Sequence, residues 1–392
     1  MLLVNFSSLR HKMFNINKQI GIYIHFPWCV RKCPYCDFNS HAIKDDTYLS
    51  QDYYKKLIAD FDTHLKNLQD REVISIFIGG GTPSLFKADY LGKVLQHIKN
   101  NAKINPNCEI TLEMNPGTVE RGSISDYANI GINRISVGVQ SFQNEKLKLL
   151  GRIHNCDNVY TTIEEIKNST ISNFNIDIMH SLPNQSFKDG VFDISQAIAM
   201  KPTHISWYQL TIEPNTLFAV KPPKLPDEET LERIEITGKK LLQEAGYYQY
   251  EISAYAKNNL RSVHNSNYWN FGDYIGIGAG AHSKITNLQT KEIKRTWKHK
   301  HPKIYSQEDN FIKDSNVVSQ DDLVYEFMLN TLRLRHGFSF DLFERQTFLP
   351  RSIIQNNLQT AIDRGLLKVN KDNVKPTYKG YLFLNDCINI FI

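Results

Sequence analysis

The sequence predicts an α/β protein in which helices cover a parallel sheet, followed by a smaller C-terminal α+β domain. Two observations predict this. Six short apolar runs alternate with helical patterns up to about residue 245, and such runs are typical of parallel strands buried on both faces. From about residue 321 the pattern changes to two helices and a short strand pair, the outline of a winged helix. Right-handed crossovers would close the sheet into a partial, TIM-like (β/α)6 barrel, with a doubly wound open sheet as the alternative.

Each element follows from its local pattern. We expect strands at the six apolar runs, which are residues 21–26, 73–78, 109–114, 134–139, 174–179 and 204–210. Amphipathic periodicity predicts helices at residues 46–69, 87–99 and 227–245. Polar residues follow or end several strands, namely Gly79 to Ser84, Glu113, Gln140, Asp177 and Thr211. Because barrel enzymes carry their chemistry at the C-terminal ends of the strands, we expect the site there.

The chain divides into four predicted segments. Residues 1–18 form an N-terminal extension, with basic but no acidic residues, so that a weak presequence or a start at Met13 is left open. Residues 19–290 form the barrel. Residues 291–319 form a basic linker, whose first 13 residues hold six Lys or Arg against one Glu and predict a solvated loop. Residues 320–392 form the C-terminal domain, whose balanced charge argues against DNA binding.

Composition excludes several classes of protein. The chain is 41% hydrophobic and 22% charged, with a net charge of +5, which is ordinary for a globular protein and does not indicate nucleic-acid binding. No apolar run approaches the ~20 residues of a membrane span, although peripheral membrane contact is left open. Three clustered and three scattered cysteines fit a reducing cytoplasm rather than a disulfide framework.

Cys29, Cys33 and Cys36 form a C-x-x-x-C-x-x-C motif directly after the first strand. Thiolates are soft ligands that suit iron–sulfur clusters, zinc and Cu(I). Four-iron clusters usually take four cysteines, but here Phe38 stands two residues after Cys36. A cluster on three cysteines leaves one iron without a protein ligand. The alternative is a zinc site on three cysteines and one histidine, His25 or His41.

The motif and its flanks, residues 23–29 and 37–41, resemble the radical S-adenosylmethionine (SAM) superfamily. Within it, they resemble the group that holds the oxygen-independent coproporphyrinogen III oxidases and the heme chaperones. The resemblance runs over most of the chain from Ile22. It implies a radical SAM barrel of the partial (β/α)6 type, a [4Fe-4S] cluster on the three cysteines, and SAM bound at the open iron.

The resemblance also implies which residues contact SAM. They are Tyr23, Gly80, Gly81, Thr82, Glu113, Gln140, Arg152 and Asp177. Considered alone, glycines 79 to 81 allow close backbone approach and expose amide hydrogens to a ligand, with an ordinary strand–helix turn as the alternative. A lone carboxylate such as Glu113 is often only a helix cap. Thr211 and His282 depart from the small or apolar residues of the family pattern.

Gly276, Gly278 and Ala281 formally fit the dinucleotide-binding fingerprint. We reject this interpretation because no clear helix follows, and because no acidic residue lies ~20 residues further on, as the motif requires. A glycine run beside the SAM adenine is the better hypothesis.

His264-Asn265-x-x-Tyr268-Trp269 is the most informative stretch outside the cysteine motif. Imidazole is a common axial ligand of heme, and aromatic rings pack on porphyrin faces. A histidine buried in an aromatic core is the plainer interpretation. The stretch, however, resembles a signature of the heme-chaperone branch, which implies that His264 contacts heme. His25 and His282 are secondary candidates.

The resemblance therefore favours a heme chaperone that transfers heme to an acceptor protein. The alternative is an oxygen-independent coproporphyrinogen III oxidase, which decarboxylates two propionates to vinyl groups. The oxidases carry a further cysteine where this chain has Phe38, and a longer segment than the 28 residues that precede Cys29. A zinc-bound structural or nucleic-acid module is the third hypothesis.

Overall fold

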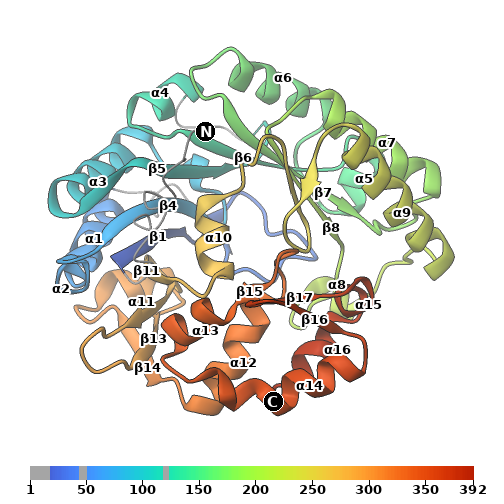
Figure 1. The fold of residues 1–392 in the computed structure, drawn as a ribbon. Coiled ribbons are helices and arrows are strands. Elements are labelled where there is room, and N and C mark those ends of the chain that lie inside the picture. Colours follow the sequence, from blue (N-terminus) through green and yellow to red (C-terminus); the bar gives the residue numbers. More distant parts are fainter. Residues whose placement is uncertain (1–17, 44–50, 118–122) are drawn as a thin grey trace, which may run out of the picture.

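The computed structural model describes residues 18–43, 51–117 and 123–392. Within these ranges the main sheet has 12 strands, in the order β14-β13-β12-β11-β1-β4-β5-β6-β7-β8-β10-β9. Figure 1 shows the sheet curving around an inner space, with helices on its outer side. The smaller C-terminal unit lies against the open side of the curve.

Six parallel strands at the centre of the sheet follow one another in chain order. They are β1 (Gln19–Phe26), β4 (Glu72–Gly80), β5 (Lys103–Met114), β6 (Arg134–Gln140), β7 (Asn173–His180) and β8 (His204–Gln209). A doubly wound sheet would reverse its strand order at a switch point. The unbroken order therefore confirms the partial barrel. All six predicted strands are present.

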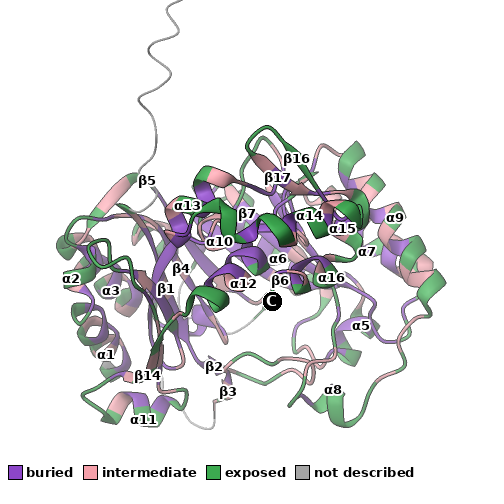
Figure 2. Ribbon diagram, turned by 60° about the horizontal axis from the view of Figure 1, so that its bottom comes forward, coloured by how far each residue is buried: buried purple, intermediate pink, exposed green. Residues whose placement is uncertain are grey.

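Helices cover the outer face of these strands. They are α1 (Gln51–Asp62), α2 (Leu65–Leu68), α3 (Ala88–Asn101), α4 (Ile124–Asn129), α5 (Asn144–Leu149), α6 (Cys156–Lys167), α7 (Phe187–Ala199) and α9 (Glu228–Glu244). The short helix α8 (Leu217–Val220) instead contacts the loop that carries the cysteines, where the Phe218 N–H donates to the Pro34 carbonyl at 3.0 Å. The helix predicted at 46–69 is α1 and α2, and its residues 46–50 lie outside the described residues. In Figure 2 the strands are buried along most of their length, whereas α7 and α9 show exposed outer faces. Ser123, Asn155 and Ser186 begin α4, α6 and α7 with capping boxes.

The sheet continues beyond the predicted strands on both edges. The added strands are β11 (Asp273–Ile277), β12 (His282–Thr286), β13 (Ile293–Lys298) and β14 (Ile312–Val317) beside β1, and β10 (Ala254–Ala256) and β9 (Tyr248–Gln249) beside β8. Helix α11 (Pro302–Gln307) joins β13 to β14.

The loop predicted for the basic stretch at residues 291–303, and with it the linker, is therefore wrong. The sequence predicted exposed cations, but Lys298 is fully buried and pairs with the equally buried Asp60 of α1. Tyr305 of α11 donates to the same carboxylate at 2.7 Å. A buried ion pair holds this strand in the sheet, which a count of charges does not reveal.

Helix α10 (Val263–Trp269) crosses the inner face of the sheet and contacts β1, β4 and β11 (Figure 1). Ser262 caps its first turn. The Glu109 carboxylate of β5 accepts from the backbone N–H groups of Val263 and His264 at 3.0 and 3.2 Å. A carboxylate is favourable at a helix N-terminus, so α10 is fixed to the barrel by its first turn.

The C-terminal domain is helical with a small antiparallel sheet, which confirms the predicted winged-helix-like α+β pattern. It contains α12 (Gln320–Thr331), α13 (Phe340–Thr347), α14 (Gln355–Asp363), α15 (Tyr378–Leu382) and α16 (Leu384–Asn389), with strands β15 (Phe338–Ser339), β16 (Leu367–Asn370) and β17 (Asn373–Pro376). Phe327, Phe338 and Phe343 pack edge to face in its separate core.

Candidate functional site

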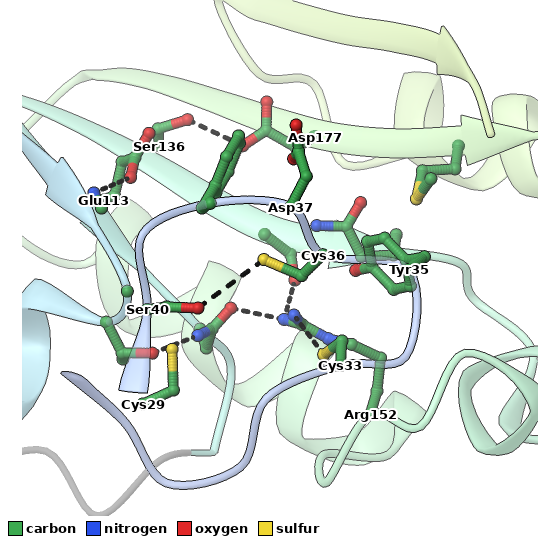
Figure 3. Close-up of a pocket in the computed structure, with 18 of the residues that line it drawn as sticks. Cys29, Cys33, Tyr35, Cys36, Asp37, Ser40, Glu113, Ser136, Arg152 and Asp177 are labelled. Carbon is green, nitrogen blue, oxygen red and sulfur yellow. Dashed lines mark hydrogen bonds between the residues drawn. The ribbon is translucent and has the colours of Figure 1, made fainter. Parts of the chain in front are cut away.

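A cavity of about 420 Å³ opens at the C-terminal ends of the parallel strands, within the ~300–1,000 Å³ typical of small-molecule sites. Ten of the twelve predicted site residues line it: Cys29, Cys33, Cys36, Gly80, Gly81, Thr82, Glu113, Gln140, Arg152 and Asp177. Figure 3 shows the three cysteines on one loop, with Glu113, Ser136 and Asp177 on the strands across from it. Tyr23 and His264 are not among the lining residues.

The cysteines lie on a loop whose two ends are held together. Strands β2 (Trp28–Cys29) and β3 (His41–Ala42) pair at its base, and the Cys36 N–H donates to the Cys33 carbonyl at 3.1 Å. The Asn39 side-chain amide donates to the carbonyls of Ala279 and Lys300 at 3.0 and 2.9 Å. The loop is therefore fixed to the β11–β14 edge of the sheet. We call residues 29–40 the cysteine loop.

Arg152 supplies positive charge beside the thiols. Its guanidinium lies 3.8 Å from the Cys33 sulfur and is oriented by the Gly138 carbonyl at 2.8 Å and by Asn115. Burial raises the pKa of the Cys29 and Cys36 thiols. A metal centre would therefore have to displace protons from both, as thiolate ligation requires, and Arg152 would stabilise the resulting negative charge.

The three thiols line one cavity, and the side chains near them bear on the zinc alternative. Across the described ranges, no three His, Cys, Asp or Glu side chains lie close enough together to hold a single metal ion. His25, one predicted zinc ligand, has both ring nitrogens engaged, by the Tyr23 hydroxyl and the Asn39 carbonyl, each at 2.9 Å. His41, the other predicted zinc ligand, differs in that its buried Nε2 atom has no hydrogen-bond partner among the described residues.

The glycine run after β4 is required by packing. A Cβ on Gly79 would lie 2.8 Å from the Glu113 carboxylate, and one on Gly81 would lie 2.3 Å from the Trp28 carbonyl. Gly80 has φ +116°, which favours glycine. The N–H groups of Gly80, Gly81 and Thr82 donate within the protein, to Glu113, Phe26 and Trp28. The expectation that these amides are exposed to a ligand is thus wrong, although Gly80, Gly81 and Thr82 do line the cavity.

Two buried carboxyl groups, those of Glu113 and Asp177, face the cavity. Burial, and then the charge of Asp177, raise the pKa of Glu113 to about 8, although the Gly80 N–H donates to this carboxylate at 3.1 Å. Burial also raises the pKa of Asp177, against hydrogen bonds from Ser136 at 2.9 Å and Asn175 at 2.7 Å. Because two neighbouring buried carboxyl groups do not readily ionise together, a cationic ligand beside them would be favoured, since it would stabilise their ionised forms.

Gln140 lies at a bulge where β6 ends, with φ +70°. A glutamine in this left-handed region is uncommon, and such positions gather at functional sites. The Tyr208 hydroxyl donates to the Gln140 side-chain oxygen at 2.8 Å. Tyr208 and Tyr35 also line the cavity but were not predicted. Tyr208 lies in an apolar run, where an aromatic residue is typical of a core, and Tyr35 lies between two cysteines that drew the prediction to themselves.

Tyr23 and His264 lie inside the barrel and do not line the cavity. His264 is only 9% exposed; its Nδ1 is 3.0 Å from the Ser75 hydroxyl, and its ring stacks on Phe77 with centroids 5.0 Å apart. Burial lowers its pKa to about 3. In this arrangement the ring is part of the barrel core, and a porphyrin could reach it only if α10 moved.

The rejected dinucleotide fingerprint lies on β11 and is followed by β12 rather than by a helix, which confirms the rejection. These glycines allow close packing. A Cβ on Gly278 would lie 2.4 Å from the His25 carbonyl, and one on Gly280 would lie 2.3 Å from the Asn39 side chain. The run does not line the cavity, so the expectation that it flanks a ligand there lacks support.

None of the helices in the described ranges is both long and apolar enough to cross a bilayer.

Comparison with known families matches both parts of the chain. Residues 23–192 match the radical SAM superfamily, and residues 318–383 match the HemN C-terminal domain. Among curated proteins, the chain is 47% identical over 377 residues to heme chaperone HemW of Haemophilus influenzae, covering 95% of this chain and 98% of that protein. It is 45% identical over 373 residues to heme chaperone HemW of Escherichia coli, covering the same shares. The chain therefore belongs to the HemW family of the radical SAM superfamily.

Among solved structures, coproporphyrinogen III oxidase (HemN) of Escherichia coli matches with a TM-score of 0.80 at 20% identity. The match covers 96% of this chain and 90% of that one. At this identity the match shows that the two proteins share a fold, barrel and C-terminal domain included.

Proposed function

We propose that this chain binds heme and transfers it to an acceptor protein. The observation that carries the proposal is the similarity, over 95% of the chain, to a protein named as a heme chaperone at 47% identity. The similarity includes both the barrel and the C-terminal domain, so it is not limited to the cysteine motif that all radical SAM proteins share.

We further propose that Cys29, Cys33 and Cys36 hold a [4Fe-4S] cluster. Three thiols lining one cavity, with Arg152 beside Cys33, support this. When bound, the cluster offers one iron without a protein ligand, at which the amino and carboxylate groups of SAM can bind.

The cavity residues would hold SAM on the side away from the cysteine loop. Glu113 and Asp177 present buried carboxyl groups whose pKa burial raises, and their ionised forms would suit the ammonium and sulfonium charges of SAM. Gly80, Gly81 and Thr82 lie next to Glu113 in the lining of the cavity, which Gln140 and Arg152 complete. Tyr23 does not line the cavity and would act on the SAM site indirectly, through its hydrogen bond to His25.

The oxidase alternative finds less support. Phe38 occupies the position of the further cysteine expected of an oxidase, and its side chain is 61% exposed. We therefore expect no vinyl product when the anaerobically reconstituted protein is incubated with coproporphyrinogen III, SAM and a reductant. Formation of that product would establish the oxidase activity and contradict the proposal.

The proposal is tested by adding heme to the anaerobically reconstituted full chain and following the Soret band. We expect saturable uptake, followed by loss of the band from this protein when an apo heme protein is added. Absence of heme uptake by the wild type would refute the chaperone function.

A cytoplasmic location is also part of the proposal, and it is supported by the six cysteines, which form no disulfide.

A further inference from the structure

We propose that heme binds at His282, the first residue of β12, with this imidazole as the axial ligand of the iron. The inference rests on the proposed function, because it names the surface that would hold the transferred heme. We call the surface formed by His282, Trp297, Arg295 and Lys300 the His282 surface. It lies on the strands that extend the barrel, outside the cavity of the cysteine loop.

The geometry at His282 suits a ligand. The His282 side chain is exposed. In the antiparallel pairing of β12 with β13, His282 lies directly opposite Trp297. The two rings stack, with centroids 6.2 Å apart and planes 26° from parallel. Trp297 is half-buried, so it provides a fixed support that limits the rotation of the imidazole.

The same stacking favours a porphyrin. An axial imidazole stands perpendicular to the porphyrin plane. An indole nearly parallel to that imidazole therefore presents its edge to the porphyrin face, which is a favoured aromatic arrangement. Trp297 would thus both orient the ligand and contact the macrocycle.

The charges at this surface also match heme. Heme carries two propionate carboxylates, which need cations. Arg295 is paired with Glu326, whereas Lys300 is exposed, so Lys300 is the better placed partner for a propionate.

The His282 surface is attached to the cysteine loop. Asn39, three residues after Cys36, donates to the backbone carbonyls of both Ala279 and Lys300. These two hydrogen bonds hold the start of β12 and the end of the β13 segment against the loop. Heme bound at His282 would therefore lie next to the segment that carries the proposed cluster ligands.

The other candidate histidines are less suited. His264 is enclosed by Ser75 and Phe77, and both ring nitrogens of His25 are engaged. Binding at either would require the barrel core to open, whereas His282 is already exposed to solvent.

The test is an anaerobic heme titration of the full chain, comparing the wild type with His282→Ala, His264→Ala and His97→Ala. His97 is the matched control, because it lies on α3 and hydrogen-bonds Asp62 at 2.7 Å, away from either proposed site. We expect His282→Ala to weaken heme binding by at least about tenfold, the lower end of what loss of a metal-site partner costs. Added imidazole should restore the histidine-ligated spectrum. The other two variants should bind as the wild type does.

Wild-type affinity and spectrum in His282→Ala would overturn the site but leave the proposed function intact. Loss of heme binding confined to His264→Ala would overturn the His282 site in favour of a site on α10. No heme uptake by the wild type would instead refute the function itself. Before heme is added, an iron content equal to that of the wild type shows that His282→Ala is folded.

As a second variant, Trp297→Leu should weaken heme binding, and Trp297→Phe should weaken it less. Equal heme affinities for the wild type and Trp297→Leu would contradict the proposed role of the indole.

Discussion

Glu113 is enclosed between the glycine run and Asp177, where burial raises its pKa from 4.5 to about 8. Since the pKa is higher in the folded than in the unfolded chain, ionisation of Glu113 lowers stability as the pH rises from about 4.5 to 8. A binding site that holds a charged side chain in this way sacrifices stability for ligand affinity.

We therefore predict that Glu113→Gln stabilises the ligand-free protein at pH 8 by roughly 1–3 kcal/mol, with a smaller difference at pH 5. The same variant should bind SAM more weakly, because the cationic ligand loses its carboxylate. Denaturant unfolding at both pH values, with the exposed Glu145→Gln as control, measures the first effect. If the gain in stability were the same at both pH values, the assigned pKa would be wrong.

Single residues also show what the sequence could predict. The cysteine spacing and the polar strand ends pointed to nine of the cavity residues, since a parallel barrel brings the ends of its strands together. The tenth, Arg152, was implied by the family resemblance alone. The inward packing of the glycine amides and the bond between Tyr208 and Gln140 could not be predicted, because both depend on how one strand lies beside the next. The depth of His264 inside the barrel depends likewise on how α10 crosses β4.

At the scale of elements, strand β13 is held by a buried charge cluster. Lys298 donates to Asp60 of α1 and lies 3.1 Å from the His64 ring. The same carboxylate accepts from the Gly278 N–H at 3.0 Å and the Tyr305 hydroxyl at 2.7 Å. This one carboxylate thus connects α1, β11, β13 and α11.

We predict that Lys298→Met destabilises the fold by about 3–5 kcal/mol, because it leaves the Asp60 carboxylate buried without its cation. Urea unfolding compares this variant with Lys294→Met, at an exposed position of the same strand. The control should stay within about 0.5 kcal/mol of the wild type. An equally small effect of Lys298→Met would mean that the cluster does not stabilise the sheet.

The strands that this cluster holds were the part of the fold least visible in the sequence. The six central strands are continuous apolar runs, and the pattern predicts them directly. Strands β12 to β14 are mixed in polarity, and their register depends on partners more than 200 positions away in the chain, such as Asp60 for Lys298. Local periodicity does not contain that information.

At the scale of the whole molecule, the C-terminal domain closes the open side of the curved sheet. Arg295 of β13 donates to the Glu326 carboxylate of α12 through two nitrogens, at 2.9 and 2.5 Å. Arg333, which follows α12, lies 4.3 Å from the ring centre of Trp269 in α10 and 3.7 Å from Glu251. The domain thus contacts both the His282 surface and the inner helix.

We predict that Glu326→Ala loosens this contact, with a loss of roughly 1–3 kcal/mol for the charged hydrogen bonds removed. Hydrogen exchange should accelerate at the N–H groups of α12 while the central strands keep their protection. The exposed Glu308→Ala serves as control. Unchanged exchange in α12 would show that the domain is held by its apolar contacts alone.

The cluster on the cysteine loop is the claim on which the account of the molecule depends. The most direct measurement is iron and acid-labile sulfide per chain after anaerobic reconstitution, with the visible spectrum, for the wild type, Cys33→Ser and Cys156→Ser. Cys156 begins α6 and lies outside the cavity. We predict iron and sulfide in the proportion of a [4Fe-4S] cluster for the wild type and Cys156→Ser, and loss of both from Cys33→Ser. Wild-type protein that holds zinc without sulfide, or equal iron and sulfide in Cys33→Ser, would contradict the account.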